Sequence, residues 1–288
     1  MLQDTSEMWQ AYRDEPLNQE QWSTIQDLYV ARKGANLWSN FSRLWQGQPL
    51  QGGETVRKNL NLDDRPVVLL AANVIGDSLT LGRQIFTDSM TEWLQETVKY
   101  FAARPDIQLI VRIHPGERYI KGPSVAEVVR QAIPDIEDKA KFPHVHLVAA
   151  SDPLNTYDLV EIADLGLVYT TTVGMEMAMS GIPVIAAGQT HYRGKGFTID
   201  PDTWPAFFNQ IERVLADPAA HRPSREQVEQ AWVYAYRFFF DYPLQFPWHL
   251  LHFWKELKAW PVARVLSAEG QAQFGESLRC LAGYPREW

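Results

Sequence analysis

Three consecutive threonines, Thr170, Thr171 and Thr172, lie between a short apolar run and a stretch with helical spacing. Hydroxyl groups and the unpaired backbone N–H groups at the start of a helix together form an anion site. Gly174 leaves room for a ligand at the first turn, and Glu176, about one turn into the helix, can accept hydrogen bonds from a ribose diol. The pattern therefore indicates an anion-binding loop, although a threonine cap and a glutamate that complements the helix dipole would explain the same residues.

The segment RIHPGE places Arg112, His114 and Glu117 at the end of another apolar run, and Pro115 stiffens the turn. Arg112 and His114 are two residues apart, so they share one face of a strand. A permanent cation beside an imidazole N–H donor suits a phosphate oxygen. This loop is a second candidate for anion binding, and a purely structural histidine is the alternative.

A further loop, GQTHYRGKGFT at 188–198, combines Arg193 and Lys195 with Gly194 and Gly196. Glycines let the backbone approach a ligand closely, and the two cations suit a phosphate or a sugar acid. The spacing is not that of a P-loop. We therefore expect this loop to contribute to the same anion-binding site.

Neither a dinucleotide cofactor nor a metal is expected. The loop after the first apolar run, NVIGDS, has one glycine where the dinucleotide-binding fingerprint needs three, so use of NAD is not predicted. His144 and His146 share a strand face, but no cysteine or carboxylate accompanies them at ligand spacing. We interpret them as part of a solvated strand face.

These loops follow short apolar runs that alternate with helical patterns. Strands are predicted at 66–74, 107–113, 144–149, 164–170 and 183–187, and helices at 89–103, 124–132, 156–162 and 173–180. Alternation of this kind predicts an α/β fold with a doubly wound parallel sheet over residues 65–215, whose ligand crevice lies at the carboxyl ends of the strands. Residues 1–64 are expected to form a helical preamble, and residues 216–288 aromatic-rich helices that pack on the sheet domain.

Composition narrows the possible partners. The net charge of −8 comes without a block of lysine or arginine, which argues against nucleic acid. No window has the 18 to 20 apolar residues that roughly suffice to span a bilayer, so membrane contact would be peripheral, through the C-terminal aromatic helices. Cys280 is the single cysteine, and the N-terminus has no signal-peptide pattern. The expectation is a cytoplasmic protein, with a peripheral position at the inner face of the membrane as the alternative.

Three segments together resemble a known family: RIHPGE, NTYDLVEIADLGLVYTTTVGMEMAMSGIPVIAAG and HYRGKGFT. Over about residues 20–245 the chain is similar to the C-terminal lobe of the capsule polysaccharide biosynthesis family, which includes bacterial GT-B transferases for Kdo, and more distantly to bacterial sialyltransferases. The resemblance implies a Rossmann-like GT-B lobe that binds a nucleotide-sugar donor as substrate, without a metal or other cofactor.

The resemblance also assigns roles to residues. It implies that His114, Thr171 and Thr172 bind the donor phosphate, that Glu176 holds the ribose, and that Asp77 and Ser78 face the cleft between two lobes. Asp77 and His114 are the candidate catalytic residues, with Asp77 acting either as a base or by orienting its loop. Loops and resemblance together give the expected donor-binding set: Ser78, Arg112, His114, Glu117, Thr170, Thr171, Thr172, Gly174, Glu176, Arg193 and Lys195.

The chain departs from a complete GT-B enzyme, because residues 1–64 contain no run of strands that could build an acceptor lobe. It is a natural half, the partner of another chain, or part of a longer protein. The leading hypothesis is transfer of a sugar from a CMP-activated acid sugar to a bacterial surface polysaccharide or glycolipid, with UDP and CDP donors left open. The alternatives are a non-catalytic nucleotide-binding or scaffolding module, and a CDP-polyol phosphotransferase.

Overall fold

The central element of the computed structural model, which describes residues 4–34, 48–249 and 252–288, is one parallel sheet. Its five strands lie in the order β3-β2-β1-β4-β5. The bounds are Val67–Ala71 for β1, Gln108–Arg112 for β2, Val145–Val148 for β3, Leu165–Val168 for β4 and Val184–Ala186 for β5. All pairings are parallel, so the predicted doubly wound sheet is confirmed.

The order of the strands decides where a ligand can bind. The chain moves outward from β1 through β2 to β3, and then returns to place β4 on the other side of β1. At such a reversal the flanking helices diverge to opposite faces, which leaves a crevice at the carboxyl ends of the two strands. Residues after β1 and β4 therefore face each other, and the backbone N–H of Thr170 donates to Asn73 Oδ1 at 3.2 Å across the gap.

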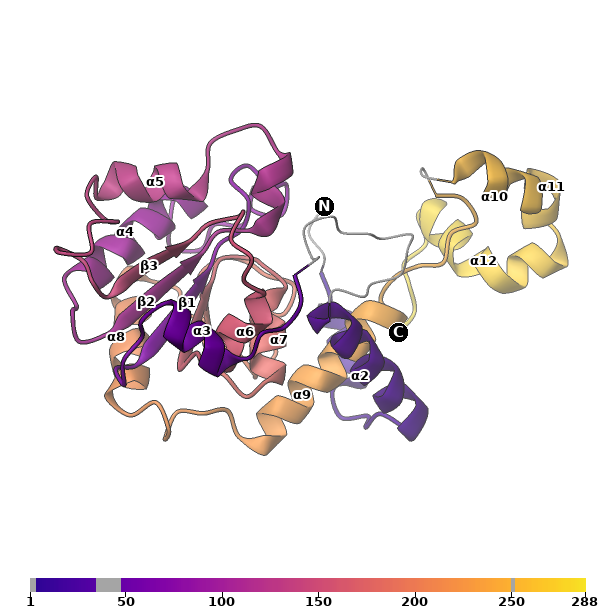
Figure 1. Cartoon of the computed structure of the whole chain (residues 1–288). Coiled ribbons are helices and arrows are strands. Elements are labelled where there is room, and N and C mark those ends of the chain that lie inside the picture. The colour runs from indigo at the N-terminus through magenta and orange to yellow at the C-terminus, as the bar shows by residue number, and fades with distance from the viewer. Residues whose placement is uncertain (1–3, 35–47, 250–251) are drawn as a thin grey trace.

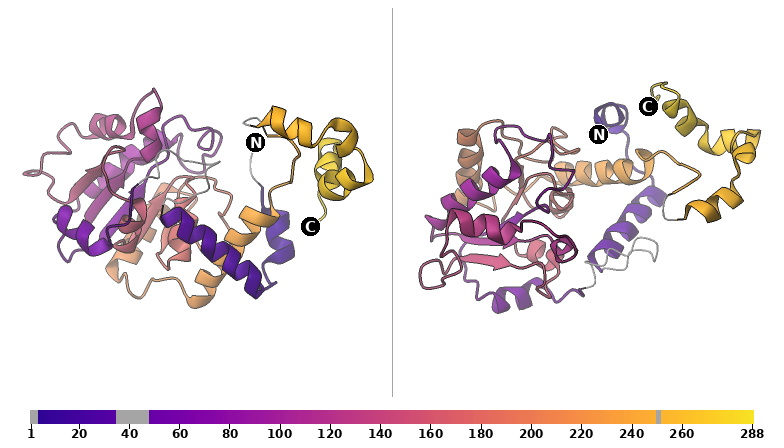
Figure 2. Two further views of the ribbon diagram at one scale, coloured as in Figure 1. Left: turned by 45° about the vertical axis from the view of Figure 1, so that its right-hand side comes forward. Right: turned by 90° about the horizontal axis from the view of Figure 1, so that it is seen from above.

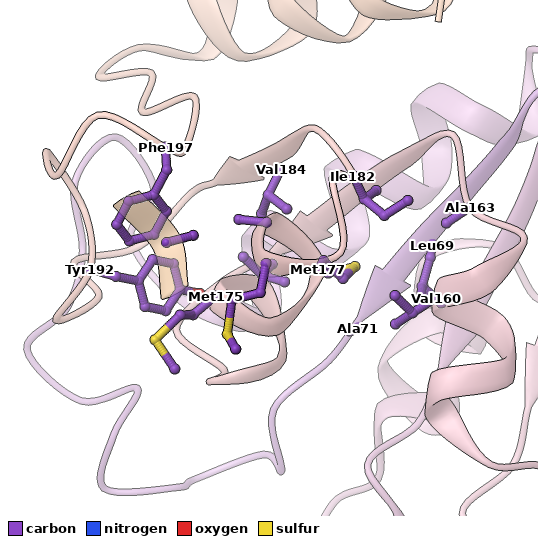
Figure 3. Packing of buried hydrophobic residues seen from close by; sticks show 14 of the residues in the cluster. Leu69, Ala71, Val160, Ala163, Met175, Met177, Ile182, Val184, Tyr192 and Phe197 are labelled. Atoms are coloured by element: carbon purple, nitrogen blue, oxygen red, sulfur yellow. The ribbon is translucent and has the colours of Figure 1, made fainter. Parts of the chain in front are cut away.

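Helices cover both faces of the sheet (Figure 1). Neighbouring strand residues point to opposite faces, so Val68 and Leu70 contribute to one apolar core and Val67 and Leu69 to the other. The first core is closed by α4 (Met90–Ala102), α5 (Val125–Ala132) and α8 (Trp204–Ala216). The second is closed by α6 (Thr156–Glu161) and α7 (Val173–Met179), with the packing shown in Figure 3.

The N-terminal region is helical where it is described. It forms α1 (Ser6–Tyr12), α2 (Gln19–Lys33) and α3 (Gly53–Asn59). Helix α3 begins at Gly53 and packs on α6. Helix α2 packs on α9 (Arg225–Tyr236) through a contact between Tyr29 and Trp232. Helices α2 and α3 of the N-terminal region therefore pack on helices of the sheet domain and its C-terminal flank.

The C-terminal region divides into two parts. Helix α9 packs on α7 and continues into a π-helical turn, η3 (Arg237–Asp241). The following helices, α10 (Phe253–Ala259), α11 (Val262–Val265) and α12 (Ala268–Leu281), lie apart from the sheet (Figures 1 and 2). The prediction that all of 216–288 packs on the sheet domain is thus wrong for these three helices, which bury Val265 and Phe274 among themselves. None of the described helices is long and apolar enough to cross a membrane.

Candidate functional site

A cavity of about 320 Å³ opens at the carboxyl ends of β1 and β4, where the strand order reverses. Four strand-end loops line it, and the N-terminal region adds Arg32 and Gln48. The polar and charged lining residues from the loops are Asn73, Asp77, Arg112, His114, Asn155, Thr156, Tyr157, Thr171, Thr172 and Glu176. Loops that are far apart in the sequence therefore meet at the crevice that the sheet topology predicts.

His114 is fixed by the turn that follows it. The short 3₁₀ helix η2 (Pro115–Tyr119) starts directly after the histidine, and the backbone N–H of Gly116 donates to His114 Nδ1 at 3.0 Å. A ring nitrogen that accepts a hydrogen bond carries no proton, so the proton of the neutral ring lies on Nε2. His114 thus lines the cavity as a hydrogen-bond donor, which is the form that suits a phosphate oxygen.

The threonine loop is arranged differently from a simple helix cap. Thr172 occupies the N-cap position of α7, yet its side chain makes no capping hydrogen bond. Its hydroxyl and that of Thr171 belong to residues that line the cavity. The backbone oxygen of Thr171 accepts a hydrogen bond from the Tyr192 hydroxyl at 2.7 Å, which anchors the loop from behind. The capping interpretation is therefore not realised for Thr172.

Gly174 serves packing rather than ligand access. A β-carbon at this position would lie 2.9 Å from Val168 Cγ2 and still closer to the Tyr192 hydroxyl. The space that the sequence assigned to a ligand is occupied by this tyrosine, which is fully buried. Gly174 is needed because Tyr192 must reach under α7 to hold the Thr171 carbonyl.

Glu176 forms a buried ion pair with Arg32 of α2. The two side chains are 3% and 8% exposed, and Arg32 Nε donates to Glu176 Oε1. Burial disfavours the charge on Arg32, but the adjacent carboxylate outweighs this effect and raises the pKa of Arg32. Burial also raises the pKa of Tyr157, and the nearby Glu176 raises it further. Sequence reasoning did not find Arg32, because 144 residues separate it from its partner.

Arg112 lines the cavity, and its guanidinium also binds the protein. Its guanidinium donates to the backbone oxygens of Ala149 and Leu154, at 2.7 and 3.0 Å, and to Thr156 Oγ1 at 3.3 Å. Burial lowers the pKa of Arg112 to about 10. These bonds hold the loop between β3 and α6 against the cavity. Arg112 thus positions this loop, and its expected contact with a phosphate stays a prediction.

The loops after β1 and β2 carry three further predicted site residues, and only one of them lines the cavity. Asp77 lines the cavity, and its Oδ1 accepts a hydrogen bond from the Leu79 backbone at 2.9 Å. Ser78 is exposed and does not line this cavity. Glu117 accepts hydrogen bonds from the Val125 backbone at 3.1 and 3.3 Å, outside the cavity lining. Of these three residues, the structure brings only Asp77 to the site.

The loop after β5 does not deliver its cations to the cavity. Arg193 donates to the backbone oxygens of Ala186 and Pro201, and Lys195 Nζ donates to Ser6 Oγ at 3.3 Å. Burial lowers the pKa of both side chains. Neither residue lines the cavity, so their expected role in donor binding is corrected to a role in closing the loop on its own strand and on α1.

The histidine pair on β3 is buried rather than solvated. His144 Nε2 lies 3.0 Å from the Phe101 carbonyl oxygen, and His146 Nε2 lies 3.0 Å from Gln108 Oε1. Burial, followed by the charge of Lys139, lowers the pKa of His146 to about 4. The prediction of a solvated strand face was wrong, because the neighbouring strand and helix supply partners for both rings. In the described part of the chain, no three histidine, cysteine or acidic residues lie close enough together to hold a metal ion.

A second, smaller cavity of about 180 Å³ adjoins the first and shares Arg32, Leu79 and Thr172 with it. Thr170 lines this second cavity and not the first. The remaining lining residues are Arg83, Gln189, Thr190, His191, Phe238 and Phe239. The threonine run therefore divides between two neighbouring cavities, with Thr172 at their common wall.

Comparison with known proteins gives similarity at the level of structure only. No family model and no curated protein matches the chain. Similar solved structures include the β-Kdo 2,4-transferase KpsC of Thermosulfurimonas dismutans, at 17% identity over 75% of this chain and 56% of that one, with a TM-score of 0.40. A sucrose-phosphate synthase of Thermosynechococcus elongatus gives 17% identity, 90% and 65% coverage, and a TM-score of 0.43.

A third similar structure is the UDP-GlcNAc 2-epimerase of Neisseria meningitidis bound to UDP-GlcNAc. It is 13% identical over 66% of this chain and 48% of that one, with a TM-score of 0.42. The chain thus spans less than two thirds of the length of each of these three proteins.

Proposed function

We propose that this chain is the donor-binding half of a GT-B-type glycosyltransferase and that a nucleotide-activated sugar binds in the first cavity. The observation that carries the proposal is the convergence of His114, Thr171, Thr172 and Glu176 on one cavity at the reversal of strand order. These residues come from two separate loops. Their donors and acceptors match a phosphate and a ribose, which is the combination that the sequence predicted.

In the proposed complex, His114 donates from Nε2 to a phosphate oxygen and the two threonine hydroxyls donate to the same group. Glu176, whose Oε1 accepts from Arg32, accepts from the ribose hydroxyls. Donors fixed before the substrate arrives stabilise the charge that develops on a departing phosphate. This arrangement supports transfer without a metal ion. Asp77 at the rim is the candidate for orienting the loop or accepting a proton from the acceptor.

The finer proposal is that the donor is a CMP-activated acid sugar and the acceptor a bacterial surface polysaccharide or glycolipid. The sequence motifs support it, since RIHPGE and HYRGKGFT resemble those of transferases for such sugars. The acceptor lobe would come from a partner chain or from a further part of the protein, because the described residues before β1 form helices only.

Thermal unfolding of the purified chain with CMP, UDP, CDP and GDP in turn tests the donor site. A ligand that binds only the folded state stabilises it, by about 2.7 kcal/mol at one hundred times Kd. We expect CMP to raise Tm and His114→Ala to abolish the shift, with a modest fall in the Tm of the free protein because the Gly116 backbone N–H loses its acceptor. His252→Ala, at an exposed histidine in the C-terminal helices, is the matched control and should keep the shift.

The outcomes separate the alternatives. If none of the four nucleotides shifts Tm, the donor-site proposal is contradicted. Tighter binding of CDP-glycerol than of CMP-activated acid sugars would favour a polyol phosphotransferase. Nucleotide binding without detectable sugar transfer or donor hydrolysis, also in the presence of the acceptor lobe, would favour a non-catalytic module.

A further inference from the structure

Four aromatic rings form a stack that runs from the second cavity to Trp288, beyond the C-terminal helices. His191, which lines this cavity, stacks on Phe238 with 3.8 Å between the ring centroids and 7° between the planes. Phe238 stacks in turn on Tyr242, at 6.0 Å and 18°. Tyr242 stacks on Trp288, at 5.9 Å and 4°. Nearly parallel rings in contact restrict each other's tilt, so the placement of Trp288 influences a wall of the cavity.

The middle of this stack belongs to the π-helical turn η3. The backbone N–H of Tyr242 donates to the carbonyl oxygen of Arg237 at 2.7 Å, five residues back in the chain. Such turns are rare and occur frequently at functional sites. Two consecutive side chains of this turn, Phe238 and Phe239, line the second cavity. The turn η3 therefore builds one wall of the cavity that adjoins the candidate donor site.

Phe239 links η3 to the first cavity through Arg32. The guanidinium of Arg32 lies 5.3 Å from the centre of the Phe239 ring, a distance at which a cation is attracted to an aromatic face. Arg32 Nε donates to Glu176 Oε1, and both side chains are buried. The guanidinium is thus held by η3 and by Glu176, so a shift of η3 would move the carboxylate that is proposed to bind the ribose.

Arg286 fixes the end of η3 from the segment that follows α12. Its guanidinium donates to the carbonyl oxygens of Asp241 and Tyr242, at 2.8 and 2.7 Å. Carbonyl oxygens at the end of a helix have no partner within it, so a cationic side chain there stabilises the last turn. The same guanidinium lies 3.9 Å from the Trp288 ring centre and pairs with Glu276 of α12 at 2.6 Å. Helices α10 to α12, which lie apart from the sheet, are joined to η3 in this way (Figures 1 and 2).

We propose that Arg286 and Trp288 are positioning residues for the donor site and act through η3. By holding this turn, they keep Arg32 and the paired Glu176 in the orientation that binds the ribose of a nucleotide. Neither Arg286 nor Trp288 is among the described residues that line the two cavities. This inference rests on the proposed donor site in the first cavity. Because coupling between two sites is reciprocal, a bound nucleotide also stabilises the contact between η3 and the segment 282–288.

The test is isothermal titration of the full chain with CMP and with 2′-deoxy-CMP, or with the corresponding pair for the nucleotide that raises Tm. The two ligands differ in one ribose hydroxyl, a group from which Glu176 is proposed to accept. We expect the parent to bind the ribonucleotide about tenfold more tightly, as loss of one hydrogen bond to a charged group implies. Trp288→Leu and Arg286→Gln should each reduce this preference to about twofold or less, and change the affinity for the deoxy form much less.

Two further variants separate positioning from a general effect on stability. Trp288→Phe keeps an aromatic ring in the stack and should retain the ribose preference. Trp254→Leu, at a 75% exposed tryptophan of α10, is the matched control for the loss of an indole and should also retain it. A role in stability alone would lower Tm without changing the ratio of the two affinities in the folded protein.

Hydrogen exchange of the parent gives a second measurement that needs no variant. With each ligand at saturating concentration, the amides of residues 237–242 should exchange more slowly in the ribonucleotide complex than in the deoxy complex. The amides of α5 should not differ between the two complexes. If neither Trp288→Leu nor Arg286→Gln folds, this measurement decides, and equal exchange at 237–242 would overturn the inference.

An unchanged ribose preference in either folded variant would overturn the role of that residue. An equal loss of affinity for both forms of the nucleotide, a loss of the preference in Trp254→Leu, or a parent without the preference would overturn the inference as a whole. In these cases the nucleotide still binds, so the donor site of the first cavity stands. If the parent binds no nucleotide, both proposals fall together.

Discussion

The loops after β4 and β5 follow neighbouring strands of the sheet, but their polar side chains have different partners. Both loops place polar or charged side chains directly after a buried strand. In the loop after β4, Thr171 and Thr172 line the first cavity. In the loop after β5, Arg193 and Lys195 bind the protein's own oxygen atoms, away from that cavity.

The two loops differ in whether the protein itself supplies hydrogen-bond partners for their polar side chains. A polar side chain at a strand end binds a ligand only if the folded chain does not provide a hydrogen-bond partner first, because burying it without a partner is costly. The β5 loop curls back on its own strand and brings carbonyl oxygens to Arg193. Arg112 behaves in the same way on the other side of the sheet, where three oxygens surround its guanidinium.

We expect the largest effect on stability from removing one partner of the buried ion pair between Arg32 and Glu176. Arg32→Met leaves the Glu176 carboxylate buried without its counter-charge, so we expect the free energy of unfolding to fall by about 3–5 kcal/mol in urea denaturation. The double variant Arg32→Met/Glu176→Gln should recover most of this loss. A single variant as stable as the parent would show that the pair is solvated in solution.

Arg193→Met tests the contrasting loop. It leaves the carbonyl oxygens of Ala186 and Pro201 without their charged donor, so we expect unfolding free energy to fall by about 2–3 kcal/mol. The Tm shift caused by nucleotide should remain, in contrast to His114→Ala, which should lose the shift. Loss of nucleotide binding in folded Arg193→Met would return this loop to the donor site.

Gly174→Ala sharpens the assignment of the glycine to packing. The added methyl group meets Val168 and the Tyr192 hydroxyl, so we expect a loss of about 1–2 kcal/mol in unfolding free energy, from overpacking and a weakened bond to Thr171. Gly122→Ala is the matched control, because a β-carbon there meets no atom within 4 Å. Unchanged stability together with weaker nucleotide binding would favour the original prediction that Gly174 makes room for a ligand.

The smallest expected effect concerns His146, which binds the protein and not the cavity. Its pKa is lowered by burial from 6.5 to about 4, so the unfolded chain binds more protons than the folded one between these pH values. Stability therefore falls as the pH is lowered from about 6.5 toward 4. Denaturation curves at pH 7, 6 and 5 should show a smaller decline for His146→Gln than for the parent. Parallel declines would mean that His146 is protonated in the folded state.

Much of the fold followed from local patterns. Five apolar runs alternating with helical spacing are sufficient to predict a parallel sheet, because a strand buried on both faces has no polar alternation. The helix bounds agree closely, since caps such as Ser89 and Ser124 are local signals and accept the expected backbone hydrogen bonds. The position of α10 to α12 was not predictable in this way, because the aromatic spacing of an amphipathic helix does not identify the surface that it covers.

By itself, the sequence determined which residue types end each strand, and therefore that His114, Thr171, Thr172 and Glu176 would gather at one edge of the sheet. Only the tertiary structure decided which of the polar groups there still have capacity for a ligand. It assigned Arg112 and Arg193 to backbone oxygens, brought Arg32 to Glu176, and divided the threonines between two cavities. The physical reason is that strand ends are set by local hydrophobic patterns, whereas hydrogen-bond partners are supplied by segments far away in the chain.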